Sequence, residues 1–284
     1  MVERTHVLST SEGSATPVAQ PAPPPRSAAK PSPFHAGMVL GERYRLVAPL
    51  GKGGMGEVWE VVHVVIGRSL ALKVVLGEGN DPELAQRLQR EAELVARLEH
   101  ANIVGVTDFG LVAANQPFVV MERLHGRTLA ELLRGRGPLP WSEARDIAVQ
   151  IAAGLACAHQ AGIVHRDLKP SNVFVLDDAQ GRLRIKIIDF GLAKATVIGP
   201  GDRALTMSGA VFGSPAYMAP EQVRGEAIDP RTDLYALGAI LYEMIVGERL
   251  WTRPSIPALL YCQLFEPAPT IRARVPEVPI ELDV

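Results

Sequence analysis

The hydrophobic and polar positions of the chain change their period near residue 127. Before it, aliphatic and β-branched runs with the character of strands occur at residues 44–47, 58–65, 70–75, 104–108 and 118–121. One helix interrupts them, because apolar residues recur at helical spacing between residues 82 and 99. This pattern predicts a sheet accompanied by a single helix.

After residue 127 the pattern is mainly helical. Residues 128–134 predict a short helix, and residues 141–160 predict a longer one rich in alanine, isoleucine and leucine. Because the longer helix is apolar on most faces, we expect it at the centre of a core. A further hydrophobic helix is expected from Asp233 to Val246. The predicted fold class is α+β, with strands in the first part and helices in the second.

The first 37 residues differ from both parts. They consist largely of Ala, Pro, Ser and Thr, with three consecutive prolines at residues 23–25. A segment with so little large apolar surface cannot offset the entropy lost on ordering, so we predict a disordered tail. A spacer is its simplest role, and a proline-rich docking segment is the alternative.

Composition narrows the range of partners. The chain has 284 residues, of which 47% are hydrophobic, and a net charge of −2. This charge gives no basic field to attract nucleic acid or an anionic membrane surface. Two widely separated cysteines, Cys157 and Cys262, exclude a disulfide framework and a cysteine-based zinc site. No run approaches the roughly 18 uninterrupted apolar residues of a membrane helix. We therefore expect a cytoplasmic protein without a membrane segment.

Candidate chemistry is concentrated in His-Arg-Asp-Leu-Lys-Pro-Ser-Asn at residues 165–172. This segment brings together a carboxylate, Asp167, an ammonium, Lys169, and an amide, Asn172. A second carboxylate, Asp189, follows the β-branched run at residues 185–188. Mg²⁺ prefers oxygen ligands, and with a nearby lysine these groups suit a Mg²⁺–phosphate complex. A polar loop between two strands is the structural alternative.

A glycine-rich turn points to the same ligand. Gly51, Gly53 and Gly56 have G-x-G-x-x-G spacing, and strand-like residues follow them, whereas a dinucleotide site opens a helix. Glycine lets backbone N–H groups approach phosphates without hindrance from a Cβ atom. A bulged hairpin is the structural alternative.

Two charged residues stand among apolar neighbours. Lys73 lies inside the strand-like run 70–75, where an unpaired buried ammonium would be costly. Glu91 lies on or beside the apolar stripe of the helix at 82–99, where a charge is out of place unless paired. A lysine on the solvent face of its strand is the structural alternative.

Together these segments resemble the protein kinases. The resemblance runs from about Leu40 to the C-terminus. It rests on the glycine-rich turn, Lys73, residues 165–172, Asp189-Phe190-Gly191, and Ala219-Pro220-Glu221 at the end of a long loop. Leu168-Lys169-Pro170 and Gly213-Ser214-Pro215 are similar to the serine/threonine class, and Gly53-Gly54-Met55-Gly56 is similar to the eukaryotic-like kinases of bacteria.

The resemblance implies a fold and an activity. The fold would be the bilobal kinase fold, with an antiparallel sheet and one helix in an N-lobe at 38–121, a hinge at 122–126 and a mainly helical C-lobe at 127–284. The activity would be transfer of the γ-phosphoryl group of ATP to Ser and Thr hydroxyls of protein substrates. Mg²⁺ would be the accompanying ion, with Mn²⁺ as an alternative.

The resemblance also implies roles for individual residues. Asp167 would orient or deprotonate the substrate hydroxyl, and Lys169 would neutralise the γ-phosphoryl group. Asn172 and Asp189 would hold the metal ion. As in the family, Lys73 would contact the α- and β-phosphates and pair with Glu91.

The nucleotide site follows from the same comparison. The backbone of the hinge would bond the adenine edge, and an apolar side chain would lie under the ring. The implied nucleotide-binding residues are Leu50, Gly51, Lys52, Gly53, Gly54, Met55, Gly56, Val58, Ala71, Lys73, Met121, Glu122, Leu124 and Phe174.

The segment from Leu192 to Met218 resembles an activation loop, and loops of this length are usually functional. In the family, an arginine at the position of Arg166 receives a phosphate carried by this loop. The best acceptor candidates are Thr206 and Ser208, followed by Thr196. Phosphorylation by a second copy of the chain would require self-association.

One departure from the family concerns Glu221. The chain ends at Val284, where the family continues with further helices and an arginine that pairs with this glutamate. We therefore expect reduced stability and an exposed apolar patch on the lower lobe. A catalytically silent pseudokinase is the alternative function. A small-molecule phosphotransferase is disfavoured, because it would have no use for the long activation segment.

Overall fold

The computed structural model describes residues 32–53, 56–75, 82–112, 116–177, 181–190 and 215–283. The chain divides into two compact units, Met1–Phe34 and His35–Val284. Most of the predicted disordered tail lies outside the described residues, so its disorder stays a prediction. All elements named below belong to the second unit.

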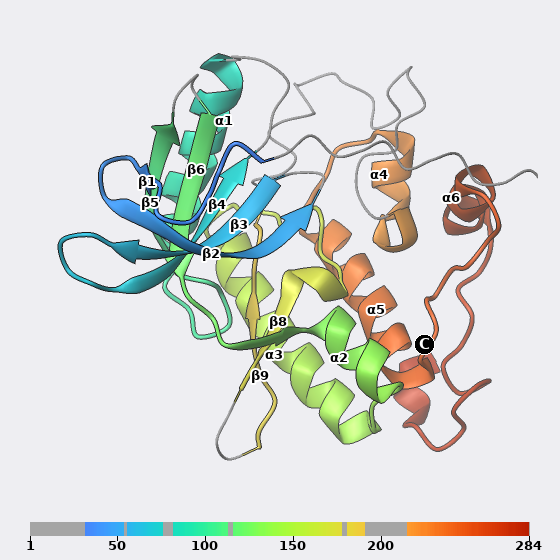
Figure 1. Ribbon diagram of the computed structural model, residues 1–284. Helices are drawn as coiled ribbons and strands as arrows, with labels where there is room; N and C mark the ends of the chain where they lie inside the picture. The colour runs from blue at the N-terminus through green and yellow to red at the C-terminus, as the bar shows by residue number, and fades with distance from the viewer. Residues whose placement is uncertain are drawn as a thin grey trace, which may run out of the picture. The chain divides into compact units, whose positions relative to one another are not determined.

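Six antiparallel strands form the N-lobe sheet, in the order β1-β2-β3-β4-β6-β5 (Figure 1). Helix α1 (Pro82–Ala96) packs against β5 and β6 and buries Leu88, Ala92 and Val95. The sheet with a single helix is the arrangement predicted for this part of the chain. The strands are β1 (Val39–Leu40), β2 (Tyr44–Gly53), β3 (Gly56–His63), β4 (Ser69–Val75), β5 (Val106–Val112) and β6 (Gln116–Glu122).

The C-lobe is mainly helical, as predicted, and carries a small second sheet with the order β7-β8-β9. Its helices are α2 (Leu129–Arg136), α3 (Trp141–Gln160), α4 (Pro220–Arg224), α5 (Pro230–Val246) and α6 (Ile256–Phe265), with 3₁₀ turns η2 (Pro170–Asn172), η3 (Pro215–Tyr217) and η4 (Ile280–Asp283). The small sheet consists of β7 (Gly126–Thr128), β8 (Val173–Leu176) and β9 (Arg184–Ile187).

Helix ends follow local side-chain chemistry. The Thr128 hydroxyl accepts the N–H of Glu131, whose carboxylate accepts the N–H of Thr128, and this capping box starts α2. Asp229 caps the start of α5 by accepting the N–H of Arg231. Gly247 ends α5 in the left-handed conformation, with φ of 80°.

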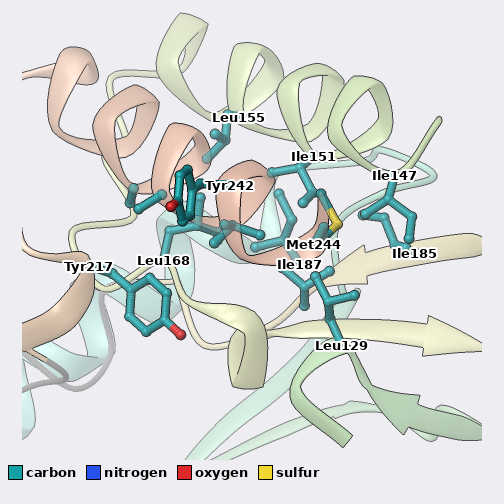
Figure 2. Close-up of a cluster of buried hydrophobic side chains, with 14 of the residues drawn as sticks. Leu129, Ile147, Ile151, Leu155, Leu168, Ile185, Ile187, Tyr217, Tyr242 and Met244 are labelled. Atoms are coloured by element: carbon teal, nitrogen blue, oxygen red, sulfur yellow. The ribbon is translucent and has the colours of Figure 1, made fainter. Parts of the chain in front are cut away.

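The core of the C-lobe lies between α3, α5 and β9. Ile147, Ile151 and Leu155 of α3 are at most 1% exposed, in agreement with the predicted central position of this helix. Figure 2 shows Ile151 and Met244 close to Ile185 and Ile187 of β9 in one apolar cluster. The strand that leads to Asp189 is therefore anchored in the largest core of the molecule.

The two lobes are joined through β9. The N–H of Val104 donates to the carbonyl of Ile187 at 3.0 Å, and the N–H of Ile187 donates to the carbonyl of Asn102 at 2.8 Å. The Lys186 ammonium lies 2.7 Å from Glu122 at the end of β6. β9 thus belongs to the contact region of both lobes.

Two aromatic side chains of the C-lobe are exposed. Tyr261 and Phe265 of α6 are 57% and 67% exposed, and their ring centroids lie 5.0 Å apart. Glu221 accepts a hydrogen bond from the Thr232 hydroxyl at 2.5 Å. None of the described helices is long and apolar enough to cross a membrane.

Candidate functional site

The antiparallel pairing of β8 and β9 brings the two predicted metal ligands to one end of a hairpin. Asn172 immediately precedes β8, and Asp189 follows the last residue of β9 by two positions. Val173 is paired with Ile187, and the N–H of Ile188 donates to the carbonyl of Asn172 at 2.9 Å. Residues 17 positions apart in sequence, 172 and 189, are therefore neighbours at the site.

Asp167 is held by the two polar residues predicted to lie beside it. The Lys169 ammonium is 2.7 Å from Asp167 Oδ2, and the Asn172 amide donates to the Asp167 carbonyl at 2.9 Å. Leu168, between them, is only 2% exposed and points into the C-lobe core (Figure 2). Because neighbouring side chains of this extended stretch point in opposite directions, burial of Leu168 directs Asp167 and Lys169 away from the core.

Asp233, at the start of α5, fixes the backbone of this loop. Its Oδ2 accepts the N–H of His165 at 2.8 Å, and its Oδ1 accepts the N–H of Arg166 at 2.9 Å. His159 Nε2 lies 2.7 Å from the same Oδ2. Arg166 has a φ of 66°, an unfavourable conformation for a side chain with a Cβ, so the loop needs such a restraint. Asp233 therefore braces the backbone of this loop.

His165 is a positioning residue to which the sequence reasoning assigned no role. It is fully buried, its ring lies 4.8 Å from that of Phe190, and its Nδ1 accepts the N–H of Asp167 at 3.3 Å. Nε2 is then the protonated nitrogen and donates to the carbonyl of Ile188 at 3.0 Å. Burial lowers the pKa of His165, and the nearby Asp233 opposes this only in part. The neutral imidazole therefore links the Asp167 loop to the Asp189 segment.

Lys73 of β4 forms an ion pair with Asp189. Lys73 is 6% exposed, and its predicted need for a partner is met by Asp189, 2.8 Å away. The pairing of Lys73 with Glu91 that the resemblance implies stays a prediction.

The Lys73–Asp189 pair keeps Asp189 ionised. Burial would raise the pKa of Asp189, but the Lys73 ammonium, with a smaller contribution from Lys169, holds it below its usual value. A carboxylate must be deprotonated to bind a metal ion. Asp189 is therefore in the protonation state that the predicted role requires.

Four of the residues expected around the adenine lie in one apolar cluster. Ala71 and Met121 are paired across β4 and β6, and Val58 and Leu124 pack against the same cluster. Phe174 is half-buried, whereas Val173 and Val175 on the opposite face of β8 are buried in the C-lobe core. Phe174 is thus absent from that core and available to a ligand.

The hinge residues are fixed by side-chain contacts. Glu122 Oε1 accepts the N–H of Gly105 at 2.7 Å, in addition to its pair with Lys186. The Arg123 guanidinium donates to the carbonyl of Leu124. These contacts hold the backbone that was expected to bond the adenine edge.

The glycines of the turn between β2 and β3 are needed for different structural reasons. A Cβ atom on Gly51 or Gly53 would meet nothing within 4 Å, whereas one on Gly56 would lie 2.1 Å from the Val74 carbonyl oxygen. Gly56 is therefore required by the close approach of β4, and the first two glycines keep the turn open. Gly54 and Met55 lie outside the described residues.

Two further residues of the turn are placed. Lys52 pairs with Glu57 at 2.8 Å, and Leu50 is 40% exposed.

The predicted phosphate acceptors Thr196, Thr206 and Ser208 lie outside the described residues.

The donor set fits a metal ion that arrives with a nucleotide. No group of three or more His, Cys, Asp or Glu side chains capable of holding a metal ion occurs in the described part of the chain. Asp189 and Asn172 together offer carboxylate and amide oxygens. Mg²⁺ is commonly held by one or two carboxylates together with substrate phosphates and water.

The comparisons with known proteins give the class. The sequence profile of the protein kinase domain matches residues 44–269, so the chain belongs to this family. The fold is that of the kinase domain of PknI from Mycobacterium tuberculosis, with a TM-score of 0.67 and 30% identity over 86% of this chain and 85% of that one.

Among named relatives, the chain is similar to two serine/threonine-protein kinases. It is 37% identical over 227 residues to the probable kinase PknB of Corynebacterium glutamicum, covering 78% of this chain and 34% of that protein. It is 37% identical over 246 residues to PknL of M. tuberculosis, covering 86% of this chain and 59% of that protein. The chain thus spans about a third to somewhat over half of the length of these relatives.

The glycine geometry predicts different effects on stability for two substitutions in one turn. Gly56→Ala should lower the free energy of unfolding by roughly 1–3 kcal/mol, because β4 must move to admit the methyl group. Gly53→Ala should change it by less than about 0.5 kcal/mol, since the site is open, but should weaken ATP binding. Urea denaturation and ATP titration of both variants test this, and equal destabilisation by the two would contradict it.

The lowered pKa of His165 predicts a loss of stability in acid. Below about pH 6.5 the unfolded chain binds a proton at this histidine while the native chain does not, so stability falls as pH decreases. This group can contribute up to about 1.4 kcal/mol per pH unit. His165→Gln removes it, so the variant should lose less stability between about pH 7.5 and about pH 5.5 in urea denaturation. An unchanged pH dependence would refute the assignment.

Proposed function

We propose that this chain is a serine/threonine protein kinase that transfers the γ-phosphoryl group of ATP to Ser and Thr hydroxyls of proteins. The observation that carries the proposal is the placement of Asp167, bound by Lys169 and adjacent to Asn172, beside the hairpin end that bears Asp189. Family membership and the names of the bacterial relatives support it.

Asp167 and Lys169 act at the phosphate-accepting hydroxyl. Asp167 Oδ1 and Oδ2 are the acceptors that hold the hydroxyl proton and orient its oxygen for attack. Lys169, 2.7 Å from Asp167 Oδ2, is close enough to neutralise charge on the transferred group. Because Asp233 fixes the backbone of the preceding residues, the position of Asp167 is set before substrate binds.

The nucleotide is held from both lobes. Val58, Ala71, Met121 and Leu124 provide the apolar surface above the adenine, and Phe174 provides the surface below it. The open turn containing Gly51 and Gly53, together with Lys73, binds the phosphates. Glu91 of α1 is the proposed carboxylate partner of Lys73.

Asn172 and Asp189 hold the metal ion. Mg²⁺, with Mn²⁺ as an alternative, supplies charge neutralisation on the phosphates when it is bound. Asp189 can bind the ion because its pKa is held below the usual value and its carboxylate is therefore ionised. Asn172 is fixed by its own hydrogen bond to the Asp167 carbonyl. Asp167 and the metal site are therefore held by the same hydrogen-bonded loop.

The proposal includes protein substrates, a cytoplasmic location and activation by phosphorylation of the loop after Asp189. Arg166 precedes Asp167 directly, is exposed, and carries a charge suited to a phosphate on Thr206 or Ser208. Self-association of two copies would allow one to phosphorylate the other.

A pseudokinase remains the alternative, but the joint placement of Lys73, Asp167 and Asp189 weighs against it.

Replacement of the proposed acid–base group should separate turnover from binding. Asp167→Asn keeps the volume of the side chain but cannot accept the hydroxyl proton, so phosphoryl transfer should fall by about 10²–10⁴-fold. ATP affinity should remain close to that of the wild type. Asp177→Asn, at an exposed carboxylate after β8, serves as the control and should retain activity. Transfer of labelled phosphate to a generic basic protein gives the rate, and an undiminished rate in Asp167→Asn would remove this residue from its role.

Loop phosphorylation can be measured directly. Purified protein incubated with MgATP should acquire phosphate in the peptide that spans Thr206 and Ser208, detected by mass spectrometry. Phosphorylation by a second copy makes the initial rate per molecule rise with protein concentration. The Asp167→Asn variant should acquire none when incubated alone. An unmodified peptide from active wild-type protein would exclude this route of activation.

A further inference from the structure

Gln222 is a buried polar residue to which the proposed function gives no role. It belongs to the short helix α4 and is 5% exposed. Its side-chain amide nitrogen, Nε2, donates to the backbone carbonyl of Arg166 at 2.8 Å. Arg166 directly precedes Asp167 and lies 56 positions before Gln222 in the chain. A single side chain therefore links α4 to the loop that carries Asp167.

A second contact of Gln222 fixes the orientation of its side-chain amide. Its Oε1 accepts the backbone N–H of Ala219 at 3.1 Å. Because an N–H group only donates and a carbonyl oxygen only accepts, one orientation of the amide satisfies both partners. In this orientation Oε1 faces Ala219 and Nε2 faces the Arg166 carbonyl. The amide is thus held at both of its polar atoms.

The Arg166 carbonyl belongs to the peptide group that joins Arg166 to Asp167. The N–H of the same peptide group donates to His165 Nδ1 at 3.3 Å. Gln222 and His165 therefore hold the two polar ends of one peptide group. Rotation of this group would turn the backbone of Asp167 and displace its carboxylate. The restraint is needed here because Arg166 has an unfavourable φ of 66°.

The space around this link admits no more than one water molecule. A cavity of about 10 Å³ lies between the loop and residues 217–222, and Asp167, Met218 and Gln222 are among the residues that line it. A water molecule needs at least about 10–15 Å³ of such volume. If an apolar side chain of the same size replaced Gln222, solvent could therefore not restore the lost hydrogen bond.

Helix α4 is itself attached to the helix that supplies Asp233. Glu221, the neighbour of Gln222, accepts the hydrogen bond from the Thr232 hydroxyl, and Thr232 directly precedes Asp233 in α5. Figure 1 shows α4 close to the beginning of α5. Gln222 and Asp233 therefore hold the Asp167 loop from two helices that are bonded to each other.

We propose that Gln222 is a positioning residue for phosphoryl transfer, which acts through the Arg166 carbonyl to hold Asp167 in its working orientation. The inference rests on the proposed kinase function, in which Asp167 orients the substrate hydroxyl. Misplacement of a reacting group by about 1 Å can lower a rate by about 100-fold. Loss of the Gln222 amide should therefore lower kcat and leave ATP affinity nearly unchanged.

Two substitutions separate the bond to Arg166 from the bond to Ala219. Gln222→Met keeps the approximate volume of the side chain and removes both bonds. Gln222→Glu keeps an acceptor for the Ala219 N–H but places a second oxygen against the Arg166 carbonyl. Both should lower kcat for transfer to a generic basic protein by about 10–100-fold, with the ATP dissociation constant changed by less than about threefold. Wild-type turnover in Gln222→Glu would overturn the proposal.

Gln150 provides a matched control in the same lobe. Its amide also donates to a backbone carbonyl at 2.8 Å, that of Leu183 before β9. Gln150→Met should lower the urea midpoint to a similar extent as Gln222→Met but should keep kcat within about twofold of the wild type. An equal loss of kcat in both variants would mean that the effect reflects stability alone, and would refute the positioning role.

A double substitution tests whether Gln222 acts through Asp167. Residues that act as a unit have strongly non-additive effects on rate. In the Asp167→Asn background, Gln222→Met should therefore lower the remaining rate by less than about twofold. A loss of the same size in both backgrounds would show that Gln222 acts independently of Asp167, which contradicts the inference.

Hydrogen exchange tests the restraint on the loop without reference to activity. Mass spectrometry of the peptide that spans residues 163–172 should show faster exchange in Gln222→Met than in the wild type or Gln150→Met. Unchanged exchange in this peptide would refute the inference, whatever the activity. Faster exchange throughout the chain in both Gln222 variants would make Gln222 a residue of general stability and would refute it as well. If the expected exchange occurs but the wild type transfers no phosphate, the kinase function fails and Gln222 still fixes this loop.

Discussion

The site depends on one buried carboxylate. Asp233 is 1% exposed and accepts the consecutive N–H groups of His165 and Arg166, so a single side chain of α5 fixes the backbone that presents Asp167. Hydrogen bonds to an ionised acceptor are each worth about 1.5–3 kcal/mol, enough to hold the unfavourable φ of Arg166. The anchoring helix is itself packed against α3 in the core. The loop that carries Asp167 is thereby held fixed by the helices of the C-lobe.

Hydrogen bonds and strand pairing position the remaining groups of the site relative to the loop that Asp233 holds. The His165 ring links the loop to Ile188, and the pairing of β8 with β9 sets Asn172 beside the segment that ends in Asp189. β9 is also bonded to the N-lobe through Ile187, and Lys73 reaches Asp189 from β4. The proposed base, metal ligands and phosphate-binding lysine therefore come from separate elements that share one hydrogen-bonded framework.

Periodicity predicted much of this fold, because strands and helices with one buried face carry their pattern in local sequence. The boundaries of α3 and the position of β4 follow from such runs. The motifs at residues 165–172 and at Asp189 identified the groups that the β8–β9 hairpin then brings together. The contact of Lys73 with Asp189 was not predicted, because the distance between these two residues depends on tertiary structure. His165 gave no local signal either, since its role arises from burial and from a contact 23 residues away.

Asp233 positions the loop that carries Asp167. Asp233→Asn keeps the size of the side chain but replaces one acceptor oxygen with a donor that cannot bind a backbone N–H group. Its most direct test is to measure turnover and ATP affinity of this variant together, after its fold has been confirmed by circular dichroism. We expect kcat to fall by at least about 100-fold, comparable to the effect expected for loss of Asp167, while the ATP dissociation constant changes by less than about threefold. A folded Asp233→Asn protein with wild-type turnover would contradict it.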